Sequence, residues 1–375
     1  MLNGGEPKTF YLGIDPTADS LHIGYFFALT MVRRLQKIGH HPIIVIGRAT
    51  ALIGDPTGKS KTRNQLSDEQ VKYNAQTYLE QIFKIIDKNK TELHYNSEWF
   101  ANMKFKDVIN LCSKTTVARM LERDDFNDRM SNHKPIAVHE FFYPLMQAYD
   151  SVAVKSDLEL GGTDQTFNVM MERNIQKDFG VAQQVPVFIP LLVGLDGKEK
   201  MSKSFGNYIG VDESPEKMYE KAMRIPDEII LDYFKLTTDL NMRDVEKWIS
   251  DDILMAHRKY AEEIIKMYHG ENFIRQAEER YNTVANGGIP NNIEIFEMNA
   301  TTLENGIPLT ELLSLSNIIS SKSEGRRMIE QNGISVNGIK EKDTNKIVRF
   351  NDFVNNELVI QRGKKVFKKI KLINS

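Results

Sequence analysis

One stretch constrains the fold of this chain more than any other: residues 11–25, which read YLGIDPTADSLHIGY. An apolar run over residues 9–14 predicts a short strand, and apolar spacing over residues 21–38 predicts a helix after a tight polar turn. Such a turn leaves backbone N–H groups at the positive end of the helix dipole, where a phosphate binds well. The candidate N-cap residues are Thr17, Asp19 and Ser20.

Two residues on the first turn of that helix suit a nucleotide. His22 can donate a hydrogen bond to a phosphate oxygen, and Gly24 lets an adenine or ribose lie close to the backbone. A histidine at a helix start can equally be structural. The prediction of a nucleotide site therefore needs a second phosphate-binding element.

The sequence KMSKS at residues 200–204 supplies that second element. Lys200 and Lys203 lie in a predicted loop, where both can converge on the β- and γ-phosphates of a nucleotide and neutralise charge on a leaving pyrophosphate. The alternative is a solvated basic loop.

The segments around these motifs predict an α/β fold. Residues 42–47, PIIVIG, form a continuous β-branched run, as expected of a parallel strand that is buried on both faces. Residues 187–193 predict another buried strand. Strands that alternate with helices in this way indicate a doubly wound, Rossmann-like parallel sheet with ligands at the carboxyl ends of its strands.

Changes in pattern along the chain predict the domain organisation. Residues 1–209 are the catalytic, nucleotide-binding domain, and residues 210–287 are an α-helical domain. Residues 288–306 hold Gly, Asn and Pro clusters and are interpreted as a linker. Residues 307–375 predict a small α+β domain of two short helices and strand pairs joined by Asn-Gly and Gly turns.

Composition excludes several classes of protein. No apolar run is long enough to span a bilayer, and the first residues hold no apolar signal segment. The single cysteine, Cys112, excludes an internal disulfide framework and a Cys-based zinc cluster. A net charge of −2 requires any nucleic-acid contact to come from a local basic surface. We expect a cytoplasmic protein without a membrane segment.

The motifs, taken in order, resemble those of the class I aminoacyl-tRNA synthetases. Beyond DSLHIG and KMSKS, five longer segments are similar to the bacterial tyrosyl-tRNA synthetase family over nearly the whole chain: YLGIDPTADSLHIG, ALIGDPTGK, FFYPLMQAYD, LGGTDQ and EKMSKSFGN.

This resemblance implies a tyrosine–tRNA ligase. Such an enzyme activates L-tyrosine with ATP to tyrosyl-adenylate and pyrophosphate, then transfers tyrosine to the 3′ end of tRNA(Tyr). It implies ATP as a substrate with Mg²⁺ on its phosphates, no structural metal, and a homodimer.

The resemblance also assigns the tyrosine site. Tyr11 and Asp150 would hold the substrate phenol, and a buried acceptor and a buried donor left unpaired would penalise an amino acid without that hydroxyl. Asp55, Tyr143 and Gln147 would bind the α-amino group. The spacing of residues 143, 147 and 150 places all three on one helix face, although an ordinary amphipathic helix would show the same spacing.

The remaining assignments concern ATP and tRNA. The catalytic residues implied by the family are Thr17, His22, Lys200 and Lys203. The residues implied to bind ATP or the adenylate are Gly13, Asp15, Gly24, Asp164, Gln165 and again Lys203. Lys59 and Arg63 would lie near the pyrophosphate and the acceptor end of tRNA, with a solvated loop as the alternative.

The tail resembles an S4 RNA-binding domain. Lys322, Arg326 and Arg327 fall near one helix face, and residues 361–375 hold six basic and no acidic side chains. A basic end can simply be solvated, but the preceding helix–strand pattern favours contacts with an RNA backbone.

Three features depart from the family pattern. Tyr25 replaces the second histidine of the HIGH motif, and Glu159 stands where one branch has glutamine. The chain also begins close to Tyr11, so either its start is truncated or this branch lacks the helices that usually precede that strand.

Three rival functions remain. The sister tryptophanyl enzyme is disfavoured because Tyr11 and Asp150 suit a phenol. A non-catalytic RNA-binding paralogue would explain Tyr25 and the short start. A small-molecule nucleotidyltransferase could share the HIGH-type turn but would leave the helical domain and the tail without a purpose.

Overall fold

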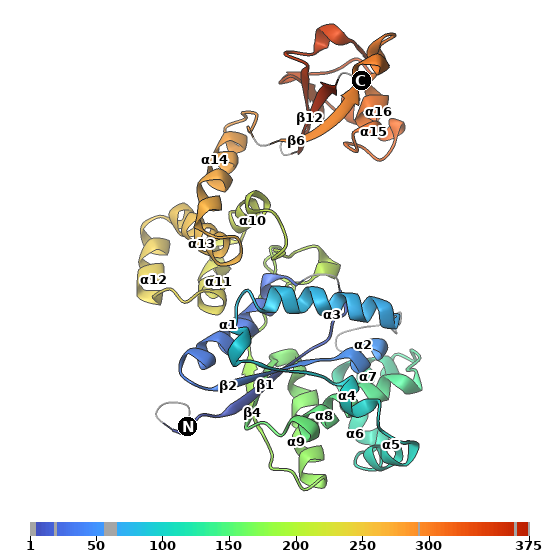
Figure 1. Ribbon diagram of the computed structural model, residues 1–375, viewed down its shortest axis with the longest axis vertical. Coiled ribbons are helices and arrows are strands. Elements are labelled where there is room, and N and C mark those ends of the chain that lie inside the picture. The colour runs from blue at the N-terminus through green and yellow to red at the C-terminus, as the bar shows by residue number, and fades with distance from the viewer. Residues whose placement is uncertain (1–4, 19–20, 56–65, 292, 364–365, 374–375) are drawn as a thin grey trace. The chain divides into compact units, whose positions relative to one another are not determined.

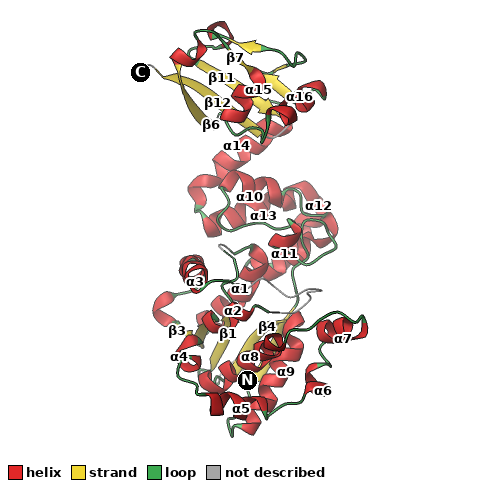
Figure 2. Cartoon of the chain, turned by 90° about the vertical axis from the view of Figure 1, so that its right-hand side faces the viewer, coloured by secondary structure: helices red, strands yellow, loops and turns green. Residues whose placement is uncertain are grey.

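The computed structural model describes residues 5–18, 21–55, 66–291, 293–363 and 366–373 of the 375-residue chain. The chain divides into two compact units, Met1–Glu271 and Asn272–Ser375. Figure 1 and Figure 2 show the elements of each unit.

A five-stranded parallel sheet forms the centre of the first unit. Its strand order is β3-β2-β1-β4-β5, and every neighbouring pair is parallel. The strands are β1 (Thr9–Ile14), β2 (His41–Ile46), β3 (Glu92–Tyr95), β4 (Leu158–Gly162) and β5 (Val185–Ile189). The burial of β2 from its second residue onward matches its β-branched sequence. The predicted doubly wound α/β fold is confirmed.

The strand order reverses between β1 and β4. The chain proceeds outward from β1 to β2 and β3 on one side, and from β4 to β5 on the other. Because parallel crossovers are right-handed, the helices of the two halves cover opposite faces of the sheet. Figure 1 shows α1 and α3 on one side and α8 and α9 on the other. A reversal of this kind opens a crevice at the carboxyl ends of the two central strands.

The helices around the sheet position the site. They are α1 (Ile23–Lys37), α2 (Arg48–Ile53), α3 (Asp68–Ile82), α4 (Ser97–Phe100), α5 (Phe105–Cys112), α6 (Val117–Met120), α7 (Asp124–Ser131), α8 (Phe142–Val154) and α9 (Thr166–Asp178). Pro144 lies in the first turn of α8, where its missing N–H group costs nothing.

The start of α1 differs from the prediction. The helix begins at Ile23, and His22 is its N-cap residue in extended conformation. The two residues before it are held outside the helix, because the Leu21 N–H donates to Gln81 Oε1 and His22 forms a β-bridge with Gly210. The prediction of Thr17 as N-cap is therefore wrong; Asp19 and Ser20 lie outside the described residues.

The helices after the sheet are divided between the two units. The first unit contains α10 (Pro215–Ala222), α11 (Ile230–Thr237), α12 (Met242–Asp251) and α13 (Ile253–Tyr268), and the second begins with α14 (Ile274–Ala285). The helical nature of this region agrees with the sequence. The predicted boundaries of the catalytic, helical and C-terminal parts remain a prediction.

A second, mixed sheet of order β6-β12-β11-β8-β9 belongs to the second unit. Its strands are β6 (Glu294–Asn299), β8 (Ile334–Val336), β9 (Ile339–Lys340), β11 (Glu357–Arg362) and β12 (Val366–Ile373), beside a small pair β7 (Ile307–Pro308) and β10 (Ile347–Val348). Helices α15 (Leu309–Leu315) and α16 (Lys322–Glu330) contribute Leu312 and Ile329 to the same buried core.

Residues 294–299 were expected within a linker, and this expectation is wrong. They form β6, which pairs in parallel with β12, and Lys368 of β12 reaches Glu294 at 2.8 Å. Pairing with β12 supplies hydrogen-bond partners for the backbone of residues 294–299, and the Gly- and Asn-rich composition around them does not predict that remote partner.

Candidate functional site

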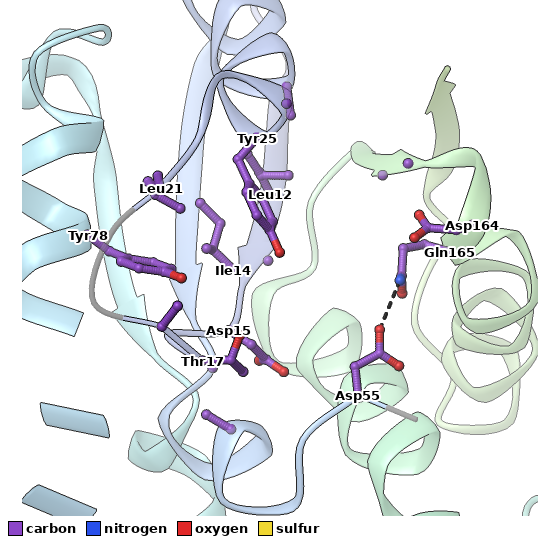
Figure 3. Close-up of a pocket in the computed structure, with 18 of the residues that line it drawn as sticks. Leu12, Ile14, Asp15, Thr17, Leu21, Tyr25, Asp55, Tyr78, Asp164 and Gln165 are labelled. Atoms are coloured by element: carbon purple, nitrogen blue, oxygen red, sulfur yellow. Dashed lines mark hydrogen bonds between the residues drawn. The ribbon is translucent and has the colours of Figure 1, made fainter. Parts of the chain in front are cut away.

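A cavity of about 670 Å³ lies at the carboxyl ends of β1 and β4 (Figure 3). Its lining includes every described residue that was predicted for the tyrosine and ATP sites: Tyr11, Gly13, Asp15, Thr17, His22, Gly24, Asp55, Tyr143, Gln147, Asp150, Asp164, Gln165, Lys200 and Lys203. These side chains come from segments on both sides of the point where the strand order reverses. The structure therefore brings them into one space.

The remaining predicted residues were assigned to the pyrophosphate, the acceptor end of tRNA or the RNA-binding tail. Lys59 and Arg63 lie outside the described residues. Lys322, Arg326 and Arg327 are exposed on α16 in the second unit, and Lys322 pairs with Glu311 at 2.9 Å.

The three residues of α8 share one face, as their spacing predicted. Tyr143, Gln147 and Asp150 all line the cavity. The Tyr143 hydroxyl donates to Asp15 Oδ2 at 2.9 Å, so α8 is linked to the turn that follows β1. Burial and the nearby Asp15 carboxylate raise the pKa of Tyr143 well above its ordinary value, which keeps it a donor.

The inner end of the cavity is polar and buried. The Tyr11 hydroxyl donates to Glu172, and Asp150 accepts hydrogen bonds from Trp99 Nε1 at 2.8 Å and Asn96 Nδ2 at 3.3 Å. Burial raises the pKa of Asp150 well above its ordinary value, while the bonds from Trp99 and Asn96 oppose that rise. This end can recognise a polar group on a substrate by hydrogen bonding.

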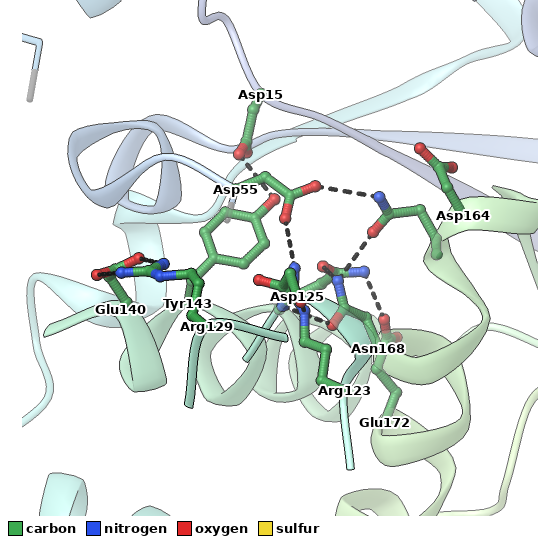
Figure 4. A network of polar contacts seen from close by, with 12 residues as sticks. Asp15, Asp55, Arg123, Asp125, Arg129, Glu140, Tyr143, Asp164, Asn168 and Glu172 are labelled. Carbon is green, nitrogen blue, oxygen red and sulfur yellow. Dashed lines mark hydrogen bonds and ion pairs between the residues drawn. The ribbon is translucent and has the colours of Figure 1, made fainter. Parts of the chain in front are cut away.

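Asp55 is the centre of a charged network beside the cavity (Figure 4). Its Oδ1 accepts from Arg123 Nη2 at 3.0 Å and its Oδ2 from Gln165 Nε2 at 3.1 Å. Arg123 also donates to Asp125 and to Asn168, and its side chain is buried. Asp55 is thus held in place by two segments of the chain. It also lines the cavity, where its carboxylate could bind an ammonium group.

The Asp15 carboxylate is positioned by a close backbone approach. Its Oδ1 accepts from Thr50 Oγ1 at 2.7 Å. A Cβ atom on Gly47 would lie 1.9 Å from that oxygen and 2.3 Å from the Thr50 hydroxyl. The glycine at the end of β2 is therefore required for the Asp15–Thr50 hydrogen bond.

His22 faces the cavity as a neutral side chain. Burial and the charge of Lys203 lower the pKa of His22 to about 4. Its ring packs on Tyr25, with centroids 4.7 Å apart, and among the described residues its Nδ1 has no hydrogen-bond partner. A buried imidazole that lacks a partner on one nitrogen is suited to bind a ligand there.

The KMSKS lysines take different partners. Lys200 Nζ lies 2.9 Å from Asp164 Oδ2, so it joins the loop after β4. Lys203 begins the short 3-10 helix η4 (Lys203–Phe205), close enough to His22 to affect its pKa. The outer end of the cavity thus combines the Lys203 cation, the neutral His22 imidazole and the N-terminus of α1, and this combination suits an anion.

Sequence reasoning missed the residues that support the site from behind. They are Thr50, Asn96, Trp99, Arg123, Asn168, Glu172 and Gln184. Most of them act on a residue that is 35 to 161 positions away in the sequence, as Thr50 does on Asp15 and Glu172 on Tyr11, so no local motif indicates them.

Two family models match the chain. The model described as tRNA synthetases class I (W and Y) matches residues 3–286, and the Tyrosine--tRNA ligase SYY-like C-terminal domain matches residues 292–370.

Similar proteins of known name include two bacterial relatives. Tyrosine--tRNA ligase 2 of Clostridium acetobutylicum is 48% identical over 367 residues, which cover 96% of this chain and 89% of the relative. Tyrosine--tRNA ligase of Aquifex aeolicus is 43% identical over 371 residues, with 98% and 93% covered.

Solved structures share the fold. A C-terminally truncated mitochondrial tyrosyl-tRNA synthetase of Aspergillus nidulans aligns with a TM-score of 0.62 at 23% identity, covering 74% of this chain and 86% of that one. Tyrosyl-tRNA synthetase of Archaeoglobus fulgidus, complexed with L-tyrosine, aligns with a TM-score of 0.57 at 22% identity, covering 74% and 91%.

Proposed function

This chain belongs to the class I tRNA synthetases, in the tyrosine–tRNA ligase family, and from that membership we propose a role for each part of its cavity. The protein is an aminoacyl-tRNA ligase: it activates L-tyrosine with ATP and transfers it to tRNA. The roles of individual residues, the metal, the oligomer and the location are the proposal.

One observation carries the proposal. A single cavity contains both a buried hydrogen-bonding end, with Tyr11 and Asp150, and an anion-binding end, with His22 and Lys203. A tyrosine side chain suits the first end and a triphosphate the second. The bond to be made, between a carboxylate and an α-phosphate, would then lie between them.

The tyrosine half of the site has two parts. Tyr11 and Asp150 hold the phenol, and Asp55, Tyr143 and Gln147 surround the α-ammonium group. The Asp55 carboxylate supports this assignment, since it already accepts from Arg123 and Gln165 at the edge of the cavity and an ammonium group would be a further donor of the same kind.

In the first step a carboxylate oxygen of tyrosine attacks the α-phosphorus of ATP, and the bond to the bridging oxygen of the β-phosphate breaks. Pyrophosphate leaves with that electron pair. Thr17, His22, Lys200 and Lys203 stabilise the charge that develops on it. Gly13, Asp15, Gly24, Asp164 and Gln165 hold the adenosine and the acyl phosphate.

In the second step the terminal ribose hydroxyl of tRNA attacks the acyl carbon, AMP leaves, and the hydroxyl proton departs with it. Lys59 and Arg63 are assigned to the pyrophosphate and acceptor side. No nucleophile of the protein is needed in either step.

Magnesium would enter with ATP on its phosphate oxygens, where it neutralises their charge. The cavity carboxylates Asp15 and Asp164 are already engaged, by Tyr143 and Thr50 and by Lys200. The residues present therefore fit an ion carried by the nucleotide better than one held by the chain.

The second unit is proposed to bind tRNA as an S4-like domain. Lys368 and Lys369 of β12 pair with Glu294 and Glu357, whereas Lys371 on the same strand and Arg326 and Arg327 on α16 are exposed and support this assignment. Their contacts would be to the RNA backbone.

We also propose a homodimer in the cytoplasm. Several large apolar side chains are exposed between residues 105 and 138: Phe105, Ile109, Val117, Met130 and Val138. Contact with a second copy of the chain would remove such side chains from water. Among the described residues, no helix combines the length and the apolar content that crossing a bilayer requires.

Tyrosine-dependent exchange of pyrophosphate into ATP tests the site. We expect exchange with tyrosine and none with tryptophan. Exchange with tryptophan alone would favour the tryptophanyl rival, and RNA binding without exchange for any amino acid would favour a non-catalytic paralogue.

A further inference from the structure

Behind the phenol-binding end lies a pair of glutamates. Glu172 on α9 is completely buried, and Glu159 on β4 is 4% exposed and lines the cavity. The two carboxyl groups are close enough for each to affect the pKa of the other, and both act on Tyr11, whose hydroxyl donates to Glu172. The catalytic scheme uses neither of them.

The hydrogen bonds identify Glu172 as the anion of the pair. Its Oε1 accepts from Gln147 Nε2 at 3.0 Å, and its Oε2 accepts from Gln184 Nε2 at 3.0 Å and from the Tyr11 hydroxyl. The amide nitrogens face Glu172 because the Gln147 and Gln184 oxygens accept from Asn168 and Gln176. Gln184 Nε2 also donates to Glu159, so Glu172 receives three donors and Glu159 receives one. The carboxylate that gathers more donors is the anion.

Glu159 therefore carries the proton. Two buried carboxylates in contact cannot both be ionised, because burial and mutual repulsion favour the neutral form. Burial raises the pKa of Glu159 well above its ordinary value and also raises that of Glu172. The titratable groups that face the pair are Tyr11 from β1 and Asp150 from α8, both acidic.

The direction of the Tyr11 proton follows from this arrangement. A phenol has one proton, and Tyr11 gives its proton to Glu172. The Tyr11 oxygen therefore presents lone pairs to the cavity, beside Asp150, whose two oxygens accept from Trp99 and Asn96 and so also act as acceptors. The inner end of the pocket offers two acceptors, whereas the substrate phenol has one proton to donate.

We propose that Glu172 is a positioning residue that turns Tyr11 into an acceptor, and that the pocket consequently accepts 4-amino-L-phenylalanine as well as tyrosine. An aromatic amine is neutral at pH 7, is close to a phenol in size, and carries two N–H donors, one for Tyr11 and one for Asp150. This inference rests on the proposed tyrosine site.

The test compares kcat/KM in pyrophosphate exchange for tyrosine, 4-amino-L-phenylalanine and phenylalanine. In the wild-type enzyme we expect kcat/KM for the amine to be within about tenfold of that for tyrosine and well above that for phenylalanine, since a matched donor adds about one hydrogen bond. Each ratio comes from a single preparation, so it does not depend on the folded fraction.

Two variants test the role of Glu172. In Glu172→Gln, Glu159 is left as the only carboxylate of the pair, and it attracts the nitrogen of the new amide. That nitrogen then donates to the Tyr11 oxygen. The Tyr11 hydroxyl loses its acceptor at residue 172 and turns its proton toward the substrate. The ratio of amine to tyrosine should fall about tenfold. Tyr11→Phe removes the acceptor itself and should lower the same ratio, because the amine loses the partner of one N–H group and its kcat/KM falls more than that of tyrosine.

Asp239→Asn is the matched control. This carboxylate is bound by Arg33, Arg34 and Lys37 away from the cavity, and its loss should leave the ratio unchanged. An amine that reacts no better than phenylalanine in the wild type, or a ratio unaltered in both variants, overturns the inference while leaving tyrosine activation intact. Absence of exchange with every amino acid overturns the proposed function as well.

Discussion

Lys200 Nζ lies 2.9 Å from Asp164 Oδ2, which joins the KMSKS loop to the loop after β4 across 36 positions of sequence. The first lysine of the motif is therefore engaged by an anion of the chain, whereas the second, Lys203, lies by His22. The two lysines are then not equivalent: Lys203 is the one whose charge acts on the pocket histidine.

Lys203→Ala should slow the activation step. Loss of one preorganised cation at the leaving pyrophosphate is expected to cost roughly 3 kcal/mol, or about a hundredfold in kcat for pyrophosphate exchange. The control is Lys198→Ala, an exposed lysine of the same loop, which should exchange normally. Equal rates for wild type and Lys203→Ala would refute the assignment.

His22 should make stability depend on pH. Because its pKa is about 4 in the folded protein and about 6.5 when unfolded, its contribution is complete above pH 6.5 and is lost as pH falls toward 4. Between pH 7.5 and pH 5 the loss is roughly 2 kcal/mol.

Urea unfolding at both pH values measures this loss. The free energy of unfolding of the wild type minus that of His22→Asn should be lower at pH 5 than at pH 7.5 by that amount. A His22 ring that titrates near 6.5 by NMR would contradict the expectation.

Arg123→Met should destabilise the first unit strongly. The substitution leaves Asp55 and the buried Asp125 without their cation, at a cost of about 3 kcal/mol or more. Arg119→Met removes a comparable pair with Glu122 whose side chains are 40% and 56% exposed, and should cost at most about 1 kcal/mol. Thermal or urea unfolding of both variants distinguishes the two cases; similar losses would show that burial does not govern this network.

Replacement by alanine should destabilise the protein at Gly47 and leave its stability unchanged at Gly13. Gly47→Ala would force its Cβ atom into the Asp15–Thr50 hydrogen bond and should cost about 1–3 kcal/mol of unfolding free energy, together with activity. A Cβ atom on Gly13 meets nothing within 4 Å, so Gly13→Ala should unfold like the wild type. Equal stability of all three proteins would argue against the close approach at Gly47.

Arg326→Ala and Arg327→Ala should weaken tRNA binding and leave pyrophosphate exchange unchanged. Each loss of a phosphate contact is expected to reduce the slope of log affinity against log salt by about 1. Lys322→Ala should have a smaller effect, because Lys322 already pairs with Glu311. The measurement is the KM for tRNA in aminoacylation at several salt concentrations, and an unchanged slope in both arginine variants would exclude α16 as the contact surface.

The sequence determined the features that are written in contiguous residues. Apolar and β-branched runs predicted β1, β2 and part of β5 but neither β3 nor β4. The i, i+4, i+7 spacing placed Tyr143, Gln147 and Asp150 on one face of α8. The ordered motifs identified the family and, through it, the residues that line the cavity. Local patterns suffice here because a helix face or a buried strand is set by neighbours in sequence.

Tertiary structure alone decided how those residues are held and charged. Asp55 meets Arg123, which lies 68 positions away, and the Tyr11 proton is directed by Glu172, 161 positions away. The start of α1 and the pairing of β6 likewise depend on remote partners, Gln81 and β12. Hydrogen-bond direction and pKa are set by burial and by whichever groups the fold brings into contact, and no periodicity in the chain records either.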